Sequence, residues 1–190
     1  MRKLILPILV FAAACSSTST QITDVYRDPN VTKFDFKRVA AIALVQDPAV
    51  RRQAEDEMAR RIGPKGVASY TVLTNEDERD PAAVRQKLQS LGFDGAVTMA
   101  LLSLREEPME YKGLVSTPSQ DFSMYYRPNA VGASGWEKVA RIETKVFSLA
   151  QDKELWSAAT KTFNPNDAQK VVASVGDALI RELRNDHLIQ

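Results

Sequence analysis

The sequence predicts a single α/β domain, built as a βαβαβ unit followed by an antiparallel hairpin and a C-terminal helix on a mixed sheet. Two continuous apolar runs, at residues 39–45 and 95–104, are typical of strands buried on both faces beneath helices. Two long segments near the C-terminus, 139–150 and 154–163, are separated by a short polar turn, which favours a hairpin. The chain should therefore form one sheet with both parallel and antiparallel neighbours.

Two Asp-Pro pairs, at 47–48 and 80–81, mark the beginnings of the helices in the βαβαβ unit. In each pair the aspartate can cap the helix, and the proline suits the first helical position. Gly63 and Gly92 are typical helix ends, so each helix should stop just before its glycine. Residues 67–73 lie between the helices and are expected to form the second strand, parallel to the two apolar runs because crossovers are right-handed.

The last helix is expected to begin after Asn166, which can serve as its N-cap. Apolar residues then recur at spacings of three and four, which predicts one face packed against the sheet. The members of this face are Ala168, Val171, Val172, Val175, Leu179 and Leu183.

The N-terminus has the composition of a secretory signal that ends at the only cysteine of the chain. Residues 1–14 combine a charged start, a short apolar run and Ala12-Ala13-Ala14, and Cys15 follows directly. The apolar run is far shorter than the ~20 residues that cross a bilayer. Ordinary cleavage after the alanines would release a protein with a free thiol, whereas a lipoprotein signal would leave an acylated cysteine as a membrane anchor. The position of the single cysteine favours the anchor.

This interpretation divides the chain into three parts. Residues 1–14 form the signal peptide, residues 15–37 the lipidated cysteine with a flexible tether and an extended lead-in, and residues 38–190 a periplasmic α/β domain. The chain has 25 Lys and Arg against 24 Asp and Glu, so it is nearly neutral. This balance gives no electrostatic basis for binding nucleic acid or an anionic surface. Membrane contact is therefore expected through the lipid anchor alone.

No cluster of residues in the sequence points to catalysis, a metal or a cofactor. The one histidine, His187, lies close to the chain end, where a frayed and solvated tail is expected. Because Cys15 is the only cysteine, the chain offers no zinc site. The acidic runs at 55–57 and 76–80 are interpreted as a solvated helix face and a loop with a helix cap. We therefore expect neither enzymatic activity nor a bound cofactor or metal.

The segment at 106–137 is much longer than an ordinary connection between strands, and loops of this length are often functional. It carries aromatic residues among glycines and prolines, and amphipathic aromatics on a loop are typical of partner-binding surfaces. The candidate partner-binding residues are Tyr111, Phe122, Tyr125, Tyr126 and Trp136. The alternative is that several of them fold back and cover the sheet.

Several short segments, spread over most of the mature chain, together resemble a family of small, uncharacterised bacterial lipoproteins. They are Tyr26-Arg27-Asp28-Pro29, the helix at 51–58, Gly92-Phe93-Asp94-Gly95-Ala96-Val97, Val146-Phe147-Ser148-Leu149 and Leu155-Trp156-Ser157-Ala158. The order of strands and helices is also similar to the amino-terminal domain of the Tol-system translocation protein, to lipoproteins of curli secretion and to lipoprotein activators of peptidoglycan synthases. The resemblance implies the fold and the anchor and, with Ser16 after the cysteine, the outer membrane.

These observations favour a non-catalytic, lipid-anchored protein of the outer membrane whose periplasmic domain binds or scaffolds another envelope component, expected to be a protein. Two alternatives stay open: an envelope hydrolase that uses two carboxylates brought together by the fold, and a carrier of a small ligand. Acids converging in one cleft would favour the hydrolase. A deep apolar pocket beneath residues 106–137 would favour the carrier, and an exposed aromatic patch would favour partner binding.

Overall fold

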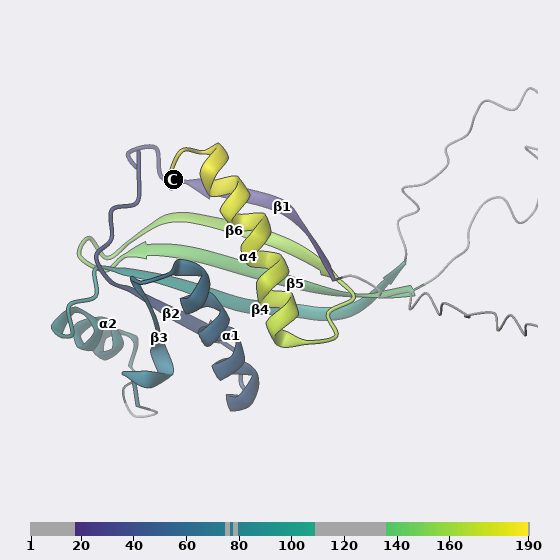
Figure 1. The fold of residues 1–190 in the computed structure, drawn as a ribbon, viewed down its shortest axis with the longest axis horizontal. Coiled ribbons are helices and arrows are strands. Elements are labelled where there is room, and N and C mark those ends of the chain that lie inside the picture. Colours follow the sequence, from purple (N-terminus) through teal and green to yellow (C-terminus); the bar gives the residue numbers. More distant parts are fainter. Residues whose placement is uncertain (1–17, 75–76, 78–79, 109–135, 190) are drawn as a thin grey trace, which may run out of the picture.

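From residue 39 onwards, the strands and helices follow the order that the sequence predicts. The computed structural model describes residues 18–74, 77, 80–108 and 136–189. The prediction of an α/β domain with a βαβαβ unit, a hairpin and a final helix is confirmed (Figure 1). In chain order the elements are β1 (Ser19–Arg27), β2 (Val39–Leu44), α1 (Pro48–Ile62), β3 (Gly66–Ala68), the 3-10 helix η1 (Ser69–Thr71), α2 (Pro81–Ser90), β4 (Gly95–Pro108), β5 (Trp136–Ser148), β6 (Lys153–Phe163) and α4 (Ala168–Asn185).

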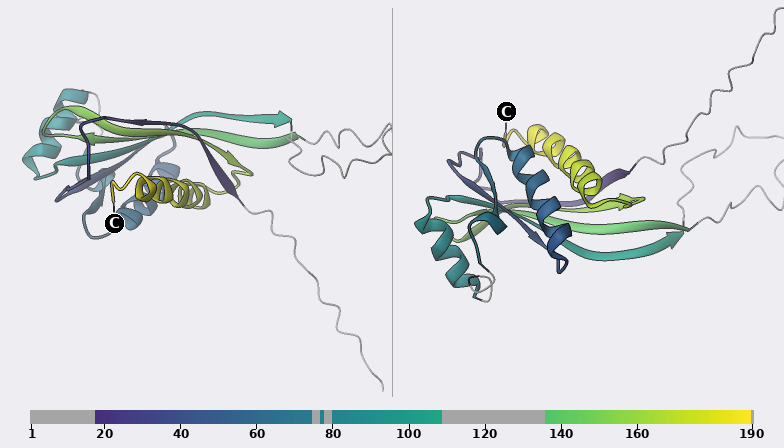
Figure 2. Two further views of the ribbon diagram at one scale, coloured as in Figure 1. Left: turned by 90° about the horizontal axis from the view of Figure 1, so that it is seen from above. Right: turned by 60° about the horizontal axis from the view of Figure 1, so that its bottom comes forward.

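One mixed sheet runs through the described part of the chain, with its six strands in the order β1-β6-β5-β4-β2-β3. β2 is parallel to both β3 and β4, and all other neighbours are antiparallel. α1 and α4 lie side by side over one face of the sheet (Figures 1 and 2). Ala41 and Ala43 face these two helices, whereas Ala40 between them belongs to a second, smaller core that Leu88 of α2 helps to form. The helices of the βαβαβ unit therefore cover opposite faces.

The larger core lies between the sheet and helices α1 and α4. Trp156 on β6 is its largest fully buried side chain, and its indole N–H donates to the carboxylate of Asp186 at 3.3 Å. Leu188, just beyond α4, is fully buried as well, and its carbonyl oxygen accepts the N–H of Phe34 at 2.9 Å. The chain end is thus packed against the domain rather than frayed as expected. His187 is exposed, as predicted.

β1 has no counterpart among the predicted elements. A flexible tether is expected through residue 21, yet Ser19–Arg27 pairs with β6 along one edge of the sheet. The hydroxyl of Thr20 lies 2.8 Å from that of Thr162 and donates to Ser174 of α4 at 2.8 Å. Small polar residues can form a strand when hydroxyl partners face them, and composition alone does not reveal such partners.

Two aspartates hold the chain between β1 and β2. Asp28 is buried and forms an ion pair with Lys153, and the hydrogen bond from this lysine lowers the pKa of the Asp28 carboxyl. At the other end, the carboxylate of Asp94 accepts the backbone N–H groups of Lys37 and Arg38, with oxygen–nitrogen distances of 2.9 to 3.0 Å. Both aspartates belong to the segments that carry the family resemblance, and here their contacts are structural.

The helix beginnings are close to those predicted. The carboxylate of Asp47 accepts the N–H groups of Ala49 and Val50 at the start of α1, and Asp80 caps α2 in the same way. α4 is capped by Asp167 rather than by the predicted Asn166, a shift of one residue. The described helices include none that is long and apolar enough to cross a membrane.

Candidate functional site

Two of the three acids at 55–57, Glu55 and Glu57, are buried, and Asp56 between them is exposed, so the prediction of a solvated face is wrong for the two glutamates. The side chain of Glu55 is fully buried, and its Oε1 accepts the N–H of Ala43 at 3.2 Å, the Nε–H of Arg51 at 2.8 Å and the hydroxyl of Ser69 at 2.8 Å. Its Oε2 accepts the N–H of Tyr70 at 2.8 Å. One carboxylate therefore joins α1 to β2 and to η1. The second strand, predicted at 67–73, ends at residue 68, and the two residues that follow it, Ser69 and Tyr70, bond this carboxylate within η1.

Glu57, two residues further along α1 and so almost on the opposite side of the helix from Glu55, is also buried and is paired with two arginines. Its carboxylate accepts Nε–H and Nη2–H of Arg60 at 2.8 and 2.6 Å, and Nε–H of Arg61 at 2.8 Å. Arg61 also bonds Asp177, so this cluster connects α1 to α4. Hydrogen bonds from Arg60, joined by Arg61, lower the pKa of Glu57 to about 2.

The carboxylates of Glu55 and Glu57 accept hydrogen bonds from other groups of the same chain. Each carboxylate is matched by an arginine on the same helix, so both charges are compensated inside the fold. In the described ranges, no group of three His, Cys, Asp or Glu side chains is placed to hold a metal ion. We therefore assign Glu55 and Glu57 to the stability of the α1 packing.

A cavity of about 400 Å³ lies in the larger core, between the sheet and helices α1 and α4. Its walls are largely apolar and come from both helices, from β4, β5 and β6 and from the chain before β2. Representative members are Met58, Met99, Trp156, Leu179 and Phe34. A volume of this size falls in the range of small-molecule sites, about 300–1,000 Å³. The carrier alternative expects a pocket beneath residues 106–137, and this cavity has none of the described members of that segment in its lining.

The second feature is a ribbon formed by β4 and β5, in which β4 continues past the end of β2 and the two strands finally run past the end of β6 as well (Figure 2, left). β2 accompanies β4 only as far as the pair Leu44 and Ala100, whereas β4 and β5 remain paired out to Pro108 and Trp136. We call residues 101–108 and 136–142 the ribbon. From residue 101 onwards, β4 has β5 on one side and no described strand on the other.

One face of the ribbon is apolar and exposed. Directly paired residues of antiparallel strands share a face, and Leu101 and Leu104 pair with Ile142 and Ala140 of the larger core. Trp136 lies four residues along β5 from Ala140, on the same face. The three outer side chains are 47, 56 and 66% exposed. We call Leu101, Leu104 and Trp136 the leucine–tryptophan face.

The opposite face of the ribbon is charged. Arg141 and Glu107 form an ion pair at 2.8 Å, and Lys161 of β6 approaches the same carboxylate at 3.4 Å. The hydrogen bond from Arg141 lowers the pKa of Glu107. Arg105 alternates with Leu104 and therefore points to this face. Apolar and charged side chains thus alternate along the ribbon, as in a surface strand. Helices α1 and α4 cover this apolar face elsewhere in the sheet but leave it exposed at the ribbon.

Among the described residues, one sequence-predicted candidate, Trp136, belongs to the ribbon. Trp136 is described and exposed. Tyr111, Phe122, Tyr125 and Tyr126 lie outside the described residues, as does Cys15. Leu101, Leu102 and Leu104 are all exposed, and none was among the candidates because the run at 95–104 suggests a strand buried on both faces. The length of that run could have indicated their exposure. The run at 95–104 is longer than the run at 39–45, so part of the longer strand has no partner in the shorter one.

Comparison with models of protein families gives no match, and neither does comparison with curated protein sequences. Among solved structures, the chain is similar to the PelC dodecamer from Paraburkholderia phytofirmans, with 14% identity, a TM-score of 0.47, and coverage of 91% of this chain and 99% of that chain. It is also similar to lipoprotein GNA1162 from Neisseria meningitidis, with 9% identity, a TM-score of 0.40, and coverage of 78% and 98%. At these values the likeness is one of general arrangement and carries no argument about function.

Proposed function

We propose that this chain is an envelope lipoprotein, anchored through Cys15, whose periplasmic domain binds another envelope protein through the leucine–tryptophan face. The observation that carries the binding proposal is the ribbon itself. Leu101, Leu104 and Trp136 are exposed on a face that the helices leave uncovered, with the pair Glu106 and Lys138 between Leu104 and Trp136. Exposed apolar patches mark interaction sites, and tryptophan is among the residues most enriched where binding energy concentrates.

The edge of the ribbon favours a protein partner over a lipid surface. Residues 101–108 pair with β5 alone among the described strands, so one edge of β4 presents N–H and C=O groups that an extended segment of another protein can pair with. The same face also carries two residues of opposite charge, Glu106 and Lys138, which are cross-strand partners. Inserting that pair and an open backbone edge into lipid would be costly, because lipid offers no hydrogen-bonding partners.

Partner binding is tested with a photo-crosslinking amino acid in intact cells. Placed at Leu104, it should capture one discrete protein. Placed at Leu91, which is exposed at the end of α2, it should capture none. Trp136→Ala should reduce the Leu104 crosslink at least about tenfold, as expected for a central interface side chain, whereas Arg105→Ala on the charged face should leave it unchanged. Equal capture from both positions, or equal effects of both substitutions, would contradict the proposal.

The anchor is tested by fractionation. Cys15→Ala should move the protein from the membrane fraction to the soluble periplasm, because the multiple acyl chains of a lipoprotein make attachment effectively permanent whereas the remaining chain has no comparable membrane affinity. Separation of inner and outer membranes on a density gradient then tests the outer-membrane location inferred from Ser16. If the unsubstituted protein is extracted without detergent, it is not a lipoprotein.

A further inference from the structure

Thr144 is the polar side chain that the larger core leaves unpaired. It lies in the middle of β5, is 2% exposed and lines the cavity. Its hydroxyl is the one buried side-chain polar atom in the described part that has no hydrogen-bond partner. Its cross-strand neighbours, Met99 and Ala158, offer none. By contrast, the nearby hydroxyl of Thr160 donates to the carbonyl oxygen of Ile142 at 3.1 Å. Such an atom is costly unless a ligand or water reaches it.

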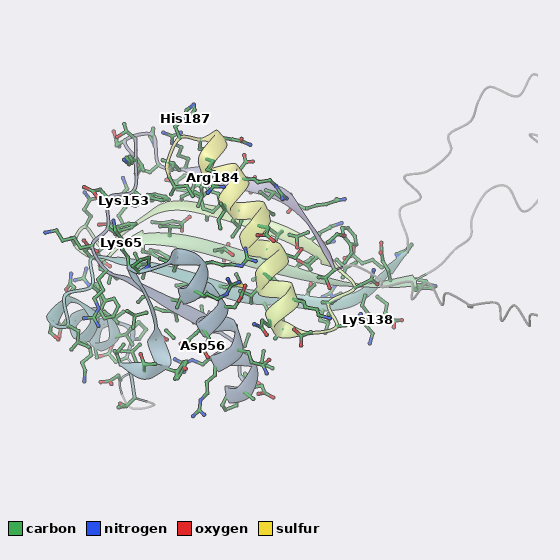
Figure 3. The ribbon with its side chains drawn as sticks, in the orientation of Figure 1. Asp56, Lys65, Lys138, Lys153, Arg184 and His187 are labelled. Atoms are coloured by element: carbon green, nitrogen blue, oxygen red, sulfur yellow. The ribbon has the colours of Figure 1, made fainter. Side chains whose placement is uncertain are left out.

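The charged residues of the cavity are all cationic. Arg61, Lys65 and Arg184 line it, and none of its lining residues is an Asp or Glu. Arg61 is committed to Glu57 and to Asp177, as described above. Lys65 and Arg184 are exposed, so they mark the mouth of the cavity, where α1 and α4 end. Figure 3 labels both at the end of the sheet away from the ribbon. In the described ranges Lys65 forms no ion pair.

We propose that this cavity binds an anionic amphiphile with a single aliphatic chain. The chain occupies the apolar space between the sheet and helices α1 and α4, and the anionic head lies at the mouth beside Lys65 and Arg184. The hydroxyl of Thr144 is placed to bond an oxygen carried on the chain itself, so a hydroxylated chain is preferred to a plain one. Apolar walls with a few convergent polar groups are the usual construction of such sites, and a cationic mouth with no acid in the lining fits a carboxylate or phosphate head.

Trp156 provides a readout, because it lines the cavity and is fully buried. The experiment uses the full chain with Cys15→Ala, so that no attached lipid competes, and with Trp136→Phe, so that Trp156 is the only indole. Its emission is followed during titration with decanoate, 3-hydroxydecanoate, decanol and decyltrimethylammonium, each below its micellar concentration. We expect saturable binding, tightest for 3-hydroxydecanoate, weaker for decanoate, and weaker again for the neutral and cationic compounds.

Two substitutions assign the contacts. Thr144→Val should abolish the preference for the hydroxylated chain, about threefold to tenfold for one hydrogen bond, while leaving decanoate binding unchanged. Lys65→Ala should weaken decanoate binding about fivefold and leave decanol binding unchanged, whereas Lys138→Ala at the ribbon should affect neither. Thr144→Val should also melt at or above the temperature of the parent, because it removes an unpaired buried hydroxyl; this shows that the variant is folded.

Three results would overturn the proposal: emission of Trp156 that does not change with any of these compounds, equal binding of all charge types, or an unchanged chain preference in Thr144→Val. A lysophosphatidylglycerol with a ten-carbon chain distinguishes the sources of the ligand. Binding as tight as that of the free acid indicates a membrane lipid, and much weaker binding indicates a free fatty acid. The cavity shares no lining residue with the leucine–tryptophan face, and Trp136→Phe only removes the second indole. A negative result in the binding titration therefore leaves the partner-binding proposal untouched, and the reverse also holds.

Discussion

Trp156→Ala should lower the free energy of unfolding by about 3–5 kcal/mol, the usual cost of truncating a large buried aromatic side chain. Trp156 is fully buried in the larger core, and its indole N–H donates to Asp186. Its removal would enlarge the existing cavity and leave the end of α4 without this contact. For a domain of this size the melting temperature should fall by on the order of 10 °C, measured by circular dichroism during heating and in urea.

The other tryptophan supplies the control. Trp136 is 66% exposed on the ribbon, so Trp136→Ala should change the free energy of unfolding by no more than about 0.5 kcal/mol. The two substitutions remove the same side chain from one sheet and differ in burial. Similar losses of stability in both variants would mean that the ribbon is packed against something in the free protein, and an unchanged Trp156→Ala would place Trp156 outside the core.

Glu55→Ala should cost about 3–5 kcal/mol, as is typical when one partner of a buried ion pair is removed. The substitution takes away the acceptor for Ala43 N–H, Tyr70 N–H, the Ser69 hydroxyl and the Arg51 Nε–H together. Buried donors that lose their acceptor bear the cost of desolvation without a bond to offset it. Urea unfolding measures the loss directly.

Asp56→Ala is the matched control on the same helix. Asp56, labelled in Figure 3, is exposed, and its carboxylate accepts the hydroxyl of Tyr70 at 2.8 Å. Its replacement should change stability by no more than about 0.5 kcal/mol, because it is a surface residue on a helix that alanine suits. If Glu55→Ala and Asp56→Ala destabilise equally, the burial of Glu55 is not what holds β2, α1 and η1 together.

The errors of the sequence-based predictions have one physical source. The acidic run at 55–57 was interpreted as a solvated helix face, yet Glu55 and Glu57 are buried. Helical periodicity registers the average polarity of a face, and it cannot show that a guanidinium, a hydroxyl and two backbone N–H groups meet a carboxylate there. The same holds for Thr20, whose hydroxyl partners are 142 and 154 residues away in the chain. In each case a distant partner changes what a polar side chain can do.

The sequence by itself determined the order of strands and helices from β2 onwards, two of the three helix caps and the hairpin, because periodicity, capping and turn formation depend on neighbouring residues. The tertiary structure alone decided that Ser19–Arg27 joins the sheet, that the second strand ends at Ala68 and that the leucines of β4 are exposed. It also decided where the cavity lies and which hydroxyl is left unpaired. Burial and hydrogen-bond satisfaction depend on which distant segments meet, and local sequence carries little information about those meetings.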